Sequence, residues 1–101
     1  MLNKEELIDM FVNNIKISSN NELKGSNLRA YYVKGTNTRV LKNYSTIIAL
    51  VNCDKDYNKL VINIDHYSQT TTRNQNLLRQ IGINNGFDIE EVDEATIYKM
   101  I

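Results

Sequence analysis

Five consecutive apolar residues, Ile47-Ile48-Ala49-Leu50-Val51, decide how we expect this chain to fold. Successive side chains of an extended chain point to opposite faces, so this stretch is apolar on both of them. Such a run is typical of a central strand that is covered on each side. It lies within residues 39–53, the longest of three extended segments, and we expect residues 39–53 to form the centre of the sheet.

The two other extended segments flank this one along the chain. Residues 28–34 are rich in Tyr and Val and end at Gly35-Thr-Asn, which is a turn signal. Residues 54–58 predict a polar hairpin turn, and residues 60–65 then alternate as in a strand with one face inward. The three segments together predict an antiparallel meander.

A helix is expected before the meander. Residues 4–15 carry apolar side chains at intervals of three to four residues, the pattern of a helix that lies on a sheet. Asn3 is the expected N-cap, with Glu6 at the spacing of a capping box. Residues 16–27 are polar and are expected to form a long connection.

Further helices are expected after the meander. The first would cover residues 70–81, with Thr70 or Thr71 as its N-cap and Gly82 ending it. A short strand and a last helix over residues 93–101 would follow. The sequence therefore predicts a single α+β domain of 101 residues, with an N-terminal helix packed on a three-stranded antiparallel meander and one or two C-terminal helices.

The composition indicates a cytoplasmic protein that stays out of membranes. No apolar run approaches the ~20 residues that span a bilayer, and the first residues are acidic and polar where a signal peptide would be basic and then apolar. Cys53 is the only cysteine, so an internal disulfide cannot form.

The net charge of zero conceals a segregation of charge along the chain. Residues 24–80 carry nine Lys or Arg against three Asp, whereas residues 1–23 and 81–101 are acidic. A neutral total argues against an acidic mimic of DNA and against a general basic nucleic-acid binder. Two interpretations stay open, because the ends could fold back and neutralise the middle or the basic middle could contact an anion.

Catalytic and metal-binding chemistry is hard to build from this sequence. One His and one Cys cannot make a zinc finger, a redox Cys pair or a His-based metal triad. Cys53 and His66 would lie about six residues apart along the predicted hairpin, or about 20 Å, far beyond hydrogen-bond reach. Acidic residues 88–94 lack the spacing of a calcium loop, and they predict a solvated helix cap or a contact to a basic protein surface. We therefore expect no enzymatic activity, no metal and no cofactor.

Residues 67–80 contain the most distinctive polar pattern. Four hydroxyl residues occur from Ser68 to Thr72, and hydroxyls with free backbone N–H groups at a helix start can bind an anion. Arg, Asn and Gln follow at helical spacings opposite the leucines, and these side chains also read purine edges. A helix cap with a solvent face, a nucleic-acid contact and a protein interface all fit. The candidate binding residues here are Tyr67, Ser68, Thr70, Arg73, Asn76 and Gln80.

Tyrosines on predicted strands are a second group of candidates. Tyr31, Tyr32 and Tyr44 lie on such strands, so at least one of them must face outward. Tyrosine is frequent in interfaces and bases stack on exposed strand aromatics, although ordinary half-buried tyrosines explain the pattern as well. Tyr31 and Tyr44 are included as candidate binding residues.

Two stretches, separated by 17 residues, carry a family resemblance: Tyr44-Ser-Thr-Ile-Ile-Ala and Tyr67-Ser-Gln-Thr-Thr-Thr-Arg with Leu77. They resemble a family of small proteins encoded by phages and mobile elements of Gram-positive and gut bacteria. The resemblance covers about residues 28–81 and implies a phage or mobile-element origin and an accessory role. Small phage proteins of this kind are frequently anti-defence factors, anti-CRISPR proteins among them.

Two functions are therefore expected as alternatives. The first is a non-enzymatic inhibitor that docks on a host protein, with a CRISPR–Cas effector as the expected partner. The second is a small nucleic-acid-binding regulator that uses the basic middle segment and the helix from Thr71. The oligomeric state stays open.

Overall fold

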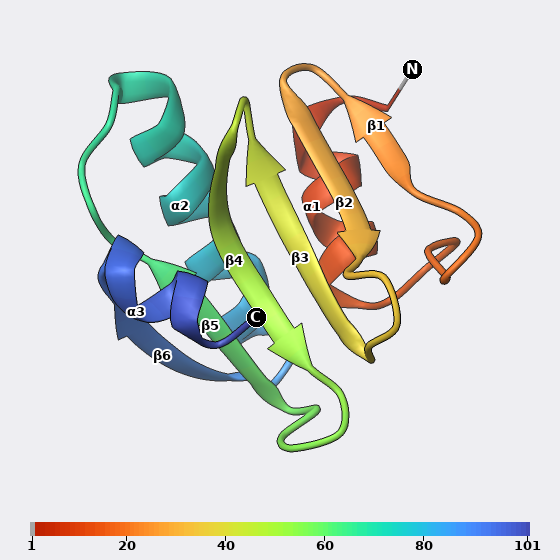
Figure 1. Cartoon of the computed structure of the whole chain (residues 1–101). Helices are drawn as coiled ribbons and strands as arrows, with labels where there is room; N and C mark the ends of the chain where they lie inside the picture. Colours follow the sequence, from red (N-terminus) through yellow and green to blue (C-terminus); the bar gives the residue numbers. More distant parts are fainter. Residues whose placement is uncertain (1) are drawn as a thin grey trace.

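The computed structural model describes residues 2–101 and contains one six-stranded sheet with helices on both faces (Figure 1). The strands are β1 (Leu23–Gly25), β2 (Leu28–Tyr32), β3 (Thr38–Asn43), β4 (Thr46–Asn52), β5 (Lys59–Asn63) and β6 (Asp88–Val92). They lie side by side in chain order, and all neighbours are antiparallel except β5 and β6, which are parallel.

Three helices cover the sheet unevenly. Helices α1 (Lys4–Val12) and α2 (Gln69–Asn84) pack on one face, which we call the inner face. Helix α3 (Glu94–Lys99) packs on the opposite, outer face, mainly over β4 and β5, and leaves β2 and β3 open there (Figure 1). The α+β class and the N-terminal helix on the sheet are as the sequence predicts. None of the helices within residues 2–101 is both long enough and apolar enough to cross a membrane.

Strand β4 confirms the expectation of a central strand that is apolar on both faces. Ile47 and Leu50 belong to the outer core, whereas Ile48, Ala49 and Val51 belong to the inner core. Two consecutive residues can share a face because the register with β3 shifts here, which leaves Ile48 as an extra residue. This bulge explains how an unbroken apolar run fills both layers.

The predicted three-stranded meander is wrong in two respects. Residues 39–53 are not one strand, because Asn43 pairs with Thr46 and the chain reverses at Tyr44, whose φ of 53° is left-handed. No Gly or Pro marks this turn in the sequence. In addition, β1 lies within the predicted polar connection, and β6 is a full strand paired parallel to β5, so the sheet has six strands.

Helix α2 is longer than predicted at both ends. Its N-cap is Ser68, not Thr70 or Thr71, and it continues through Gly82 to Asn84. A Cβ atom at Gly82 would lie 2.7 Å from Leu60 Cδ2 and 2.9 Å from Ile89 Cδ1. Gly82 therefore allows the helix to approach the sheet closely and does not end it.

Helix α1 ends at Val12 instead of residue 15, and a buried arginine of β3 holds that end. The Arg39 guanidinium donates hydrogen bonds to the carbonyl of Phe11 (2.8 Å) and to that of Val12 (2.9 Å). The last carbonyls of a helix lack intrahelical donors and carry partial negative charge. They therefore satisfy the buried cation, and the helix is anchored to the sheet.

Candidate functional site

Hydroxyl side chains order the connection from β5 to α2. The Ser68 hydroxyl accepts a hydrogen bond from the backbone N–H of Thr71 (3.2 Å), and the Thr72 hydroxyl donates to the Ser68 carbonyl (2.9 Å). Thr70 is exposed in the first helical turn. A helix cap therefore forms in this segment, and Ser68 makes it instead of the predicted Thr70 or Thr71.

Tyr67 is fixed just before this cap. Its hydroxyl accepts a hydrogen bond from the Asn63 side-chain amide at the end of β5 (2.8 Å). Partial burial raises the pKa of the Tyr67 phenol above its ordinary value. The same Asn63 amide also donates to the carbonyl of Ile47 (3.1 Å), so it joins β4, β5 and the connection.

The face of α2 that lies on the sheet is polar over its first turns. Thr71, Asn74 and Gln75 are buried there at helical spacings. The Asn43 side-chain amide donates to the Thr71 hydroxyl (2.8 Å), and Asn74 Nδ2 donates to Asn43 Oδ1 (2.8 Å). Asn74 Oδ1 is buried without a hydrogen-bond partner. These contacts attach the helix to the end of β3.

Gln75 attaches the same helix to the end of β5. Its Nε2 donates to the carbonyl of Asn63 (2.6 Å) and to that of Asp65 (2.9 Å). The sequence reasoning missed this polar layer, although Thr71, Asn74 and Gln75 share a helical stripe with Leu78. That shared stripe is the signal that could have identified them as interior residues.

The opposite face of α2 is exposed and free of acids. Arg73, Asn76, Gln80 and Ile83 follow one another at intervals of three and four residues, and we call them the α2 outer face. Ile83 is 58% exposed, and a shallow depression of about 290 Å³ lies beside it. Arg79 borders this face, donating to Asn76 Oδ1 (2.9 Å) and to the Glu91 carboxylate (3.2 Å). The structure thus brings Arg73, Asn76 and Gln80 together as predicted.

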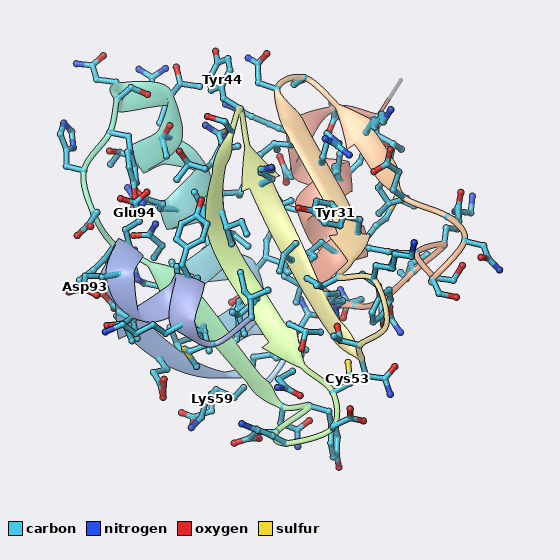
Figure 2. All side chains as sticks on the ribbon, viewed as in Figure 1. Tyr31, Tyr44, Cys53, Lys59, Asp93 and Glu94 are labelled. Atoms are coloured by element: carbon cyan, nitrogen blue, oxygen red, sulfur yellow. The ribbon has the colours of Figure 1, made fainter. Side chains whose placement is uncertain are left out.

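The candidate tyrosines of the sheet lie apart from the α2 outer face. Tyr31 is half-buried on the open part of the outer sheet face, whereas α2 covers the inner face (Figure 2). Tyr44 is 62% exposed at the β3–β4 turn, and its hydroxyl accepts a hydrogen bond from the Asn27 amide (2.9 Å). The eight candidate residues therefore do not form one surface.

Around Tyr31 the open part of the sheet is basic. The Arg29 guanidinium lies 5.4 Å from the centre of the Tyr31 ring, and Arg29 pairs with Lys42 directly across β2 and β3. Like charges at such positions destabilise a sheet. Glu22 compensates one of them through a hydrogen bond from Arg29 (3.0 Å), which lowers the pKa of the Glu22 carboxyl. Within residues 2–101, Lys42 makes no ion pair.

The acidic residues near the C-terminus contact other parts of the chain. Glu90 pairs with Lys59 (3.4 Å) and Glu91 with Arg79 (3.2 Å). Asp93 caps α3 by accepting from the N–H of Thr96 (2.9 Å), and hydrogen bonding from the Thr96 side chain, together with this backbone bond, lowers the pKa of Asp93. These contacts favour the interpretation in which the acidic ends neutralise the basic middle and cap a helix.

Cys53 and His66 belong to opposite ends of the β4–β5 hairpin. Cys53 follows β4, near the start of β5, and its Sγ accepts from Arg39 Nη1 (3.2 Å). His66 follows the end of β5, and its Nδ1 lies 3.3 Å from the Thr72 hydroxyl. Neither side chain is placed to activate the other.

No family model matches this chain, and neither does any curated protein or solved structure. Residues 44–49 form the β3–β4 turn and the first part of β4, and residues 67–73 form the cap and the first residues of α2.

Proposed function

We propose that the protein is a non-enzymatic accessory protein that binds a host protein through the α2 outer face and so inhibits a host defence component. One observation carries this proposal: α2 has polar side chains on both of its faces, and only the face that packs on the sheet is buried. The family resemblance makes a CRISPR–Cas effector the first partner to test.

The composition of the α2 outer face supports a protein partner. Arginine is enriched at interfaces, where it often contributes much of the binding energy. Arg73 supplies the charge, Asn76 and Gln80 supply donors and acceptors, and the exposed Ile83 supplies apolar area. The rigid helix holds all four in one row, so little backbone conformational entropy is lost on binding.

The non-enzymatic part of the proposal is supported by the placement of Cys53 and His66. A nucleophile and its base must lie within hydrogen-bond reach, and these two side chains occupy opposite ends of a hairpin. Cys53→Ala and His66→Ala are therefore expected to retain inhibition. Loss of inhibition in either folded variant would contradict this part.

The test is a binding assay between the full chain and purified CRISPR–Cas effectors. Arg73→Ala should weaken binding by about 1–3 kcal/mol if the contact is a charge-assisted hydrogen bond. Lys34→Ala, which removes an exposed cation from the β2–β3 turn, is the matched control. Binding that survives Arg73→Ala unchanged would count against this face, and a chain that binds no effector would rule out the effector as partner.

A nucleic-acid-binding regulator is the second candidate function, and the basic patch around Tyr31 favours it. Arg29 and Lys42 are paired across two strands beside an aromatic ring, an arrangement that suits phosphates and a stacked base. Binding to random DNA and RNA at increasing salt is the test. Affinity that falls steeply with salt, with a slope reduced by about one for each of Arg29→Gln and Lys42→Gln, would favour this candidate.

A further inference from the structure

A pocket of about 270 Å³ opens on the outer face of the sheet, the face that carries α3. Helix α2, with its exposed row of binding candidates, lies on the opposite side of the sheet. Its floor is apolar and consists of Leu50 from β4, Val61 from β5 and Met100 after α3. Its rim is charged and includes Lys55, Asp56, Lys59, Glu90 and Lys99. Figure 2 shows Lys59 at this end of the sheet, far from the β3–β4 turn.

The charges on the rim do not cancel. Lys59 is compensated by Glu90 (3.4 Å) and by Asp56 (3.6 Å). Within the described residues 2–101, neither Lys55 nor Lys99 makes an ion pair. Among the lining residues, three cations therefore face two carboxylates, which gives these five residues a net charge of +1 (3 − 2).

We propose that this pocket binds a small amphipathic carboxylate, whose apolar body covers the floor and whose anionic head lies between Lys55 and Lys99. Small-molecule sites combine an apolar lining with a few convergent polar groups, and this pocket has both. A single negative charge matches the net charge of the rim. An apolar chain of modest length gains free energy mainly by displacing water from the half-buried Met100, since Leu50 and Val61 are already almost fully buried.

The site is independent of the proposed protein-binding function. Its lining comes from β4, β5 and the connection between them, from β6 and from the end of α3, and includes no residue of α2. A failure of one proposal therefore leaves the other standing. Ligand binding also needs no chemistry from Cys53 or His66.

The experiment is a titration of the isotope-labelled full chain, followed by amide chemical shifts. Octanoate is the probe, octanamide is its neutral counterpart, and octyl phosphate tests a more highly charged head. We expect saturable shifts at the amides of Asn52, Lys59 and Met100 with octanoate. Octanamide should produce none at the same concentration.

Variants of the rim test the role of its cations. Lys55→Gln and Lys99→Gln should each weaken octanoate binding by about two- to fivefold, the effect of one partly exposed ion pair. Lys34→Gln, in the β2–β3 turn and outside the pocket lining, should change nothing. Met100→Glu should abolish binding by placing a carboxylate in the pocket, and its melting curve shows whether the fold survives. Lys55→Gln and Lys99→Gln carry the test if it does not.

Several results would overturn the proposal. If octanoate leaves the pocket amides unshifted, the pocket does not bind it. If octanamide binds equally well, the charge of the head group plays no role. An equal loss of affinity in Lys34→Gln would reduce the effect to net charge alone. Tighter binding of octyl phosphate than of octanoate would exclude a carboxylate as the preferred head.

Discussion

The two faces of α2 carry the same kinds of side chain but have different roles. Asn74 and Gln75 are buried and hydrogen-bonded to the ends of β3 and β5, whereas Asn76 and Gln80 are exposed. A buried amide costs free energy unless it finds partners, so the inner pair is tied to the fold. An exposed amide keeps its hydrogen-bonding capacity for another molecule. Residue type alone therefore does not separate structural from binding residues on this helix.

The largest expected effect on stability comes from the apolar part of the α2 face that packs on the sheet. Leu78→Ala should lower the free energy of unfolding by about 2–5 kcal/mol, because Leu78 is fully buried and its loss leaves a cavity. Leu77, its half-buried neighbour, is the control, and Leu77→Ala should cost clearly less. Urea denaturation measures both. Equal losses would show that Leu77 contributes as much to the core as Leu78.

The next largest effect should come from Gln75. Gln75→Ala leaves the carbonyls of Asn63 and Asp65 without their donor, which should cost about 1–3 kcal/mol of unfolding free energy. Gln80→Ala, on the exposed face, should stay within about 0.5 kcal/mol of the wild type. A Gln75→Ala protein as stable as Gln80→Ala would mean that water replaces the lost donor.

Much of the sheet core and of the N-terminal helix could be predicted from local pattern. The Asn3–Glu6 capping box forms as expected, with the Glu6 N–H donating to Asn3 Oδ1 (2.8 Å). The apolar run at Ile47 could be assigned to a central strand because every side chain in it needs cover. These features depend only on residues close in sequence.

Other features depend on contacts between distant residues, and the sequence pattern could not supply them. Tyr44 adopts a left-handed backbone conformation that Gly or Asn adopts more easily. Because a tyrosine stands there instead, the sequence carries no turn signal at this position. Asn43 and Thr71 are 28 residues apart, and their hydrogen bond exists only once the sheet and helix have met. The pocket at Leu50 was missed for the same reason, since its lining comes from β4, β5, β6 and residues around α3.

Asn74 should show a smaller effect than Gln75. Asn74→Ala removes the donor to Asn43 Oδ1, but it also removes a buried oxygen that has no partner. Because the second loss offsets part of the first, we expect a decrease in unfolding free energy of about 0.5–1.5 kcal/mol. Asn76→Ala, two residues further on, is the matched control and should be close to neutral. A neutral Asn74→Ala would indicate that the unpartnered oxygen cancels the hydrogen bond.

The smallest effect on stability, and the largest on binding, is expected when Arg73, Asn76 and Gln80 are changed together to Ala. Exposed side chains typically matter by less than about 0.5 kcal/mol each, and Ala is the best helix former, so the melting temperature should barely move. Arg79 loses its contact to Asn76 in this variant but keeps Glu91. Partner binding should fall by more than in Arg73→Ala alone, because the amide contacts are lost as well.

If instead the triple variant melts normally and binds normally, both faces of α2 serve only the fold and its solubility. The basic patch around Tyr31 would then be the surface to test next.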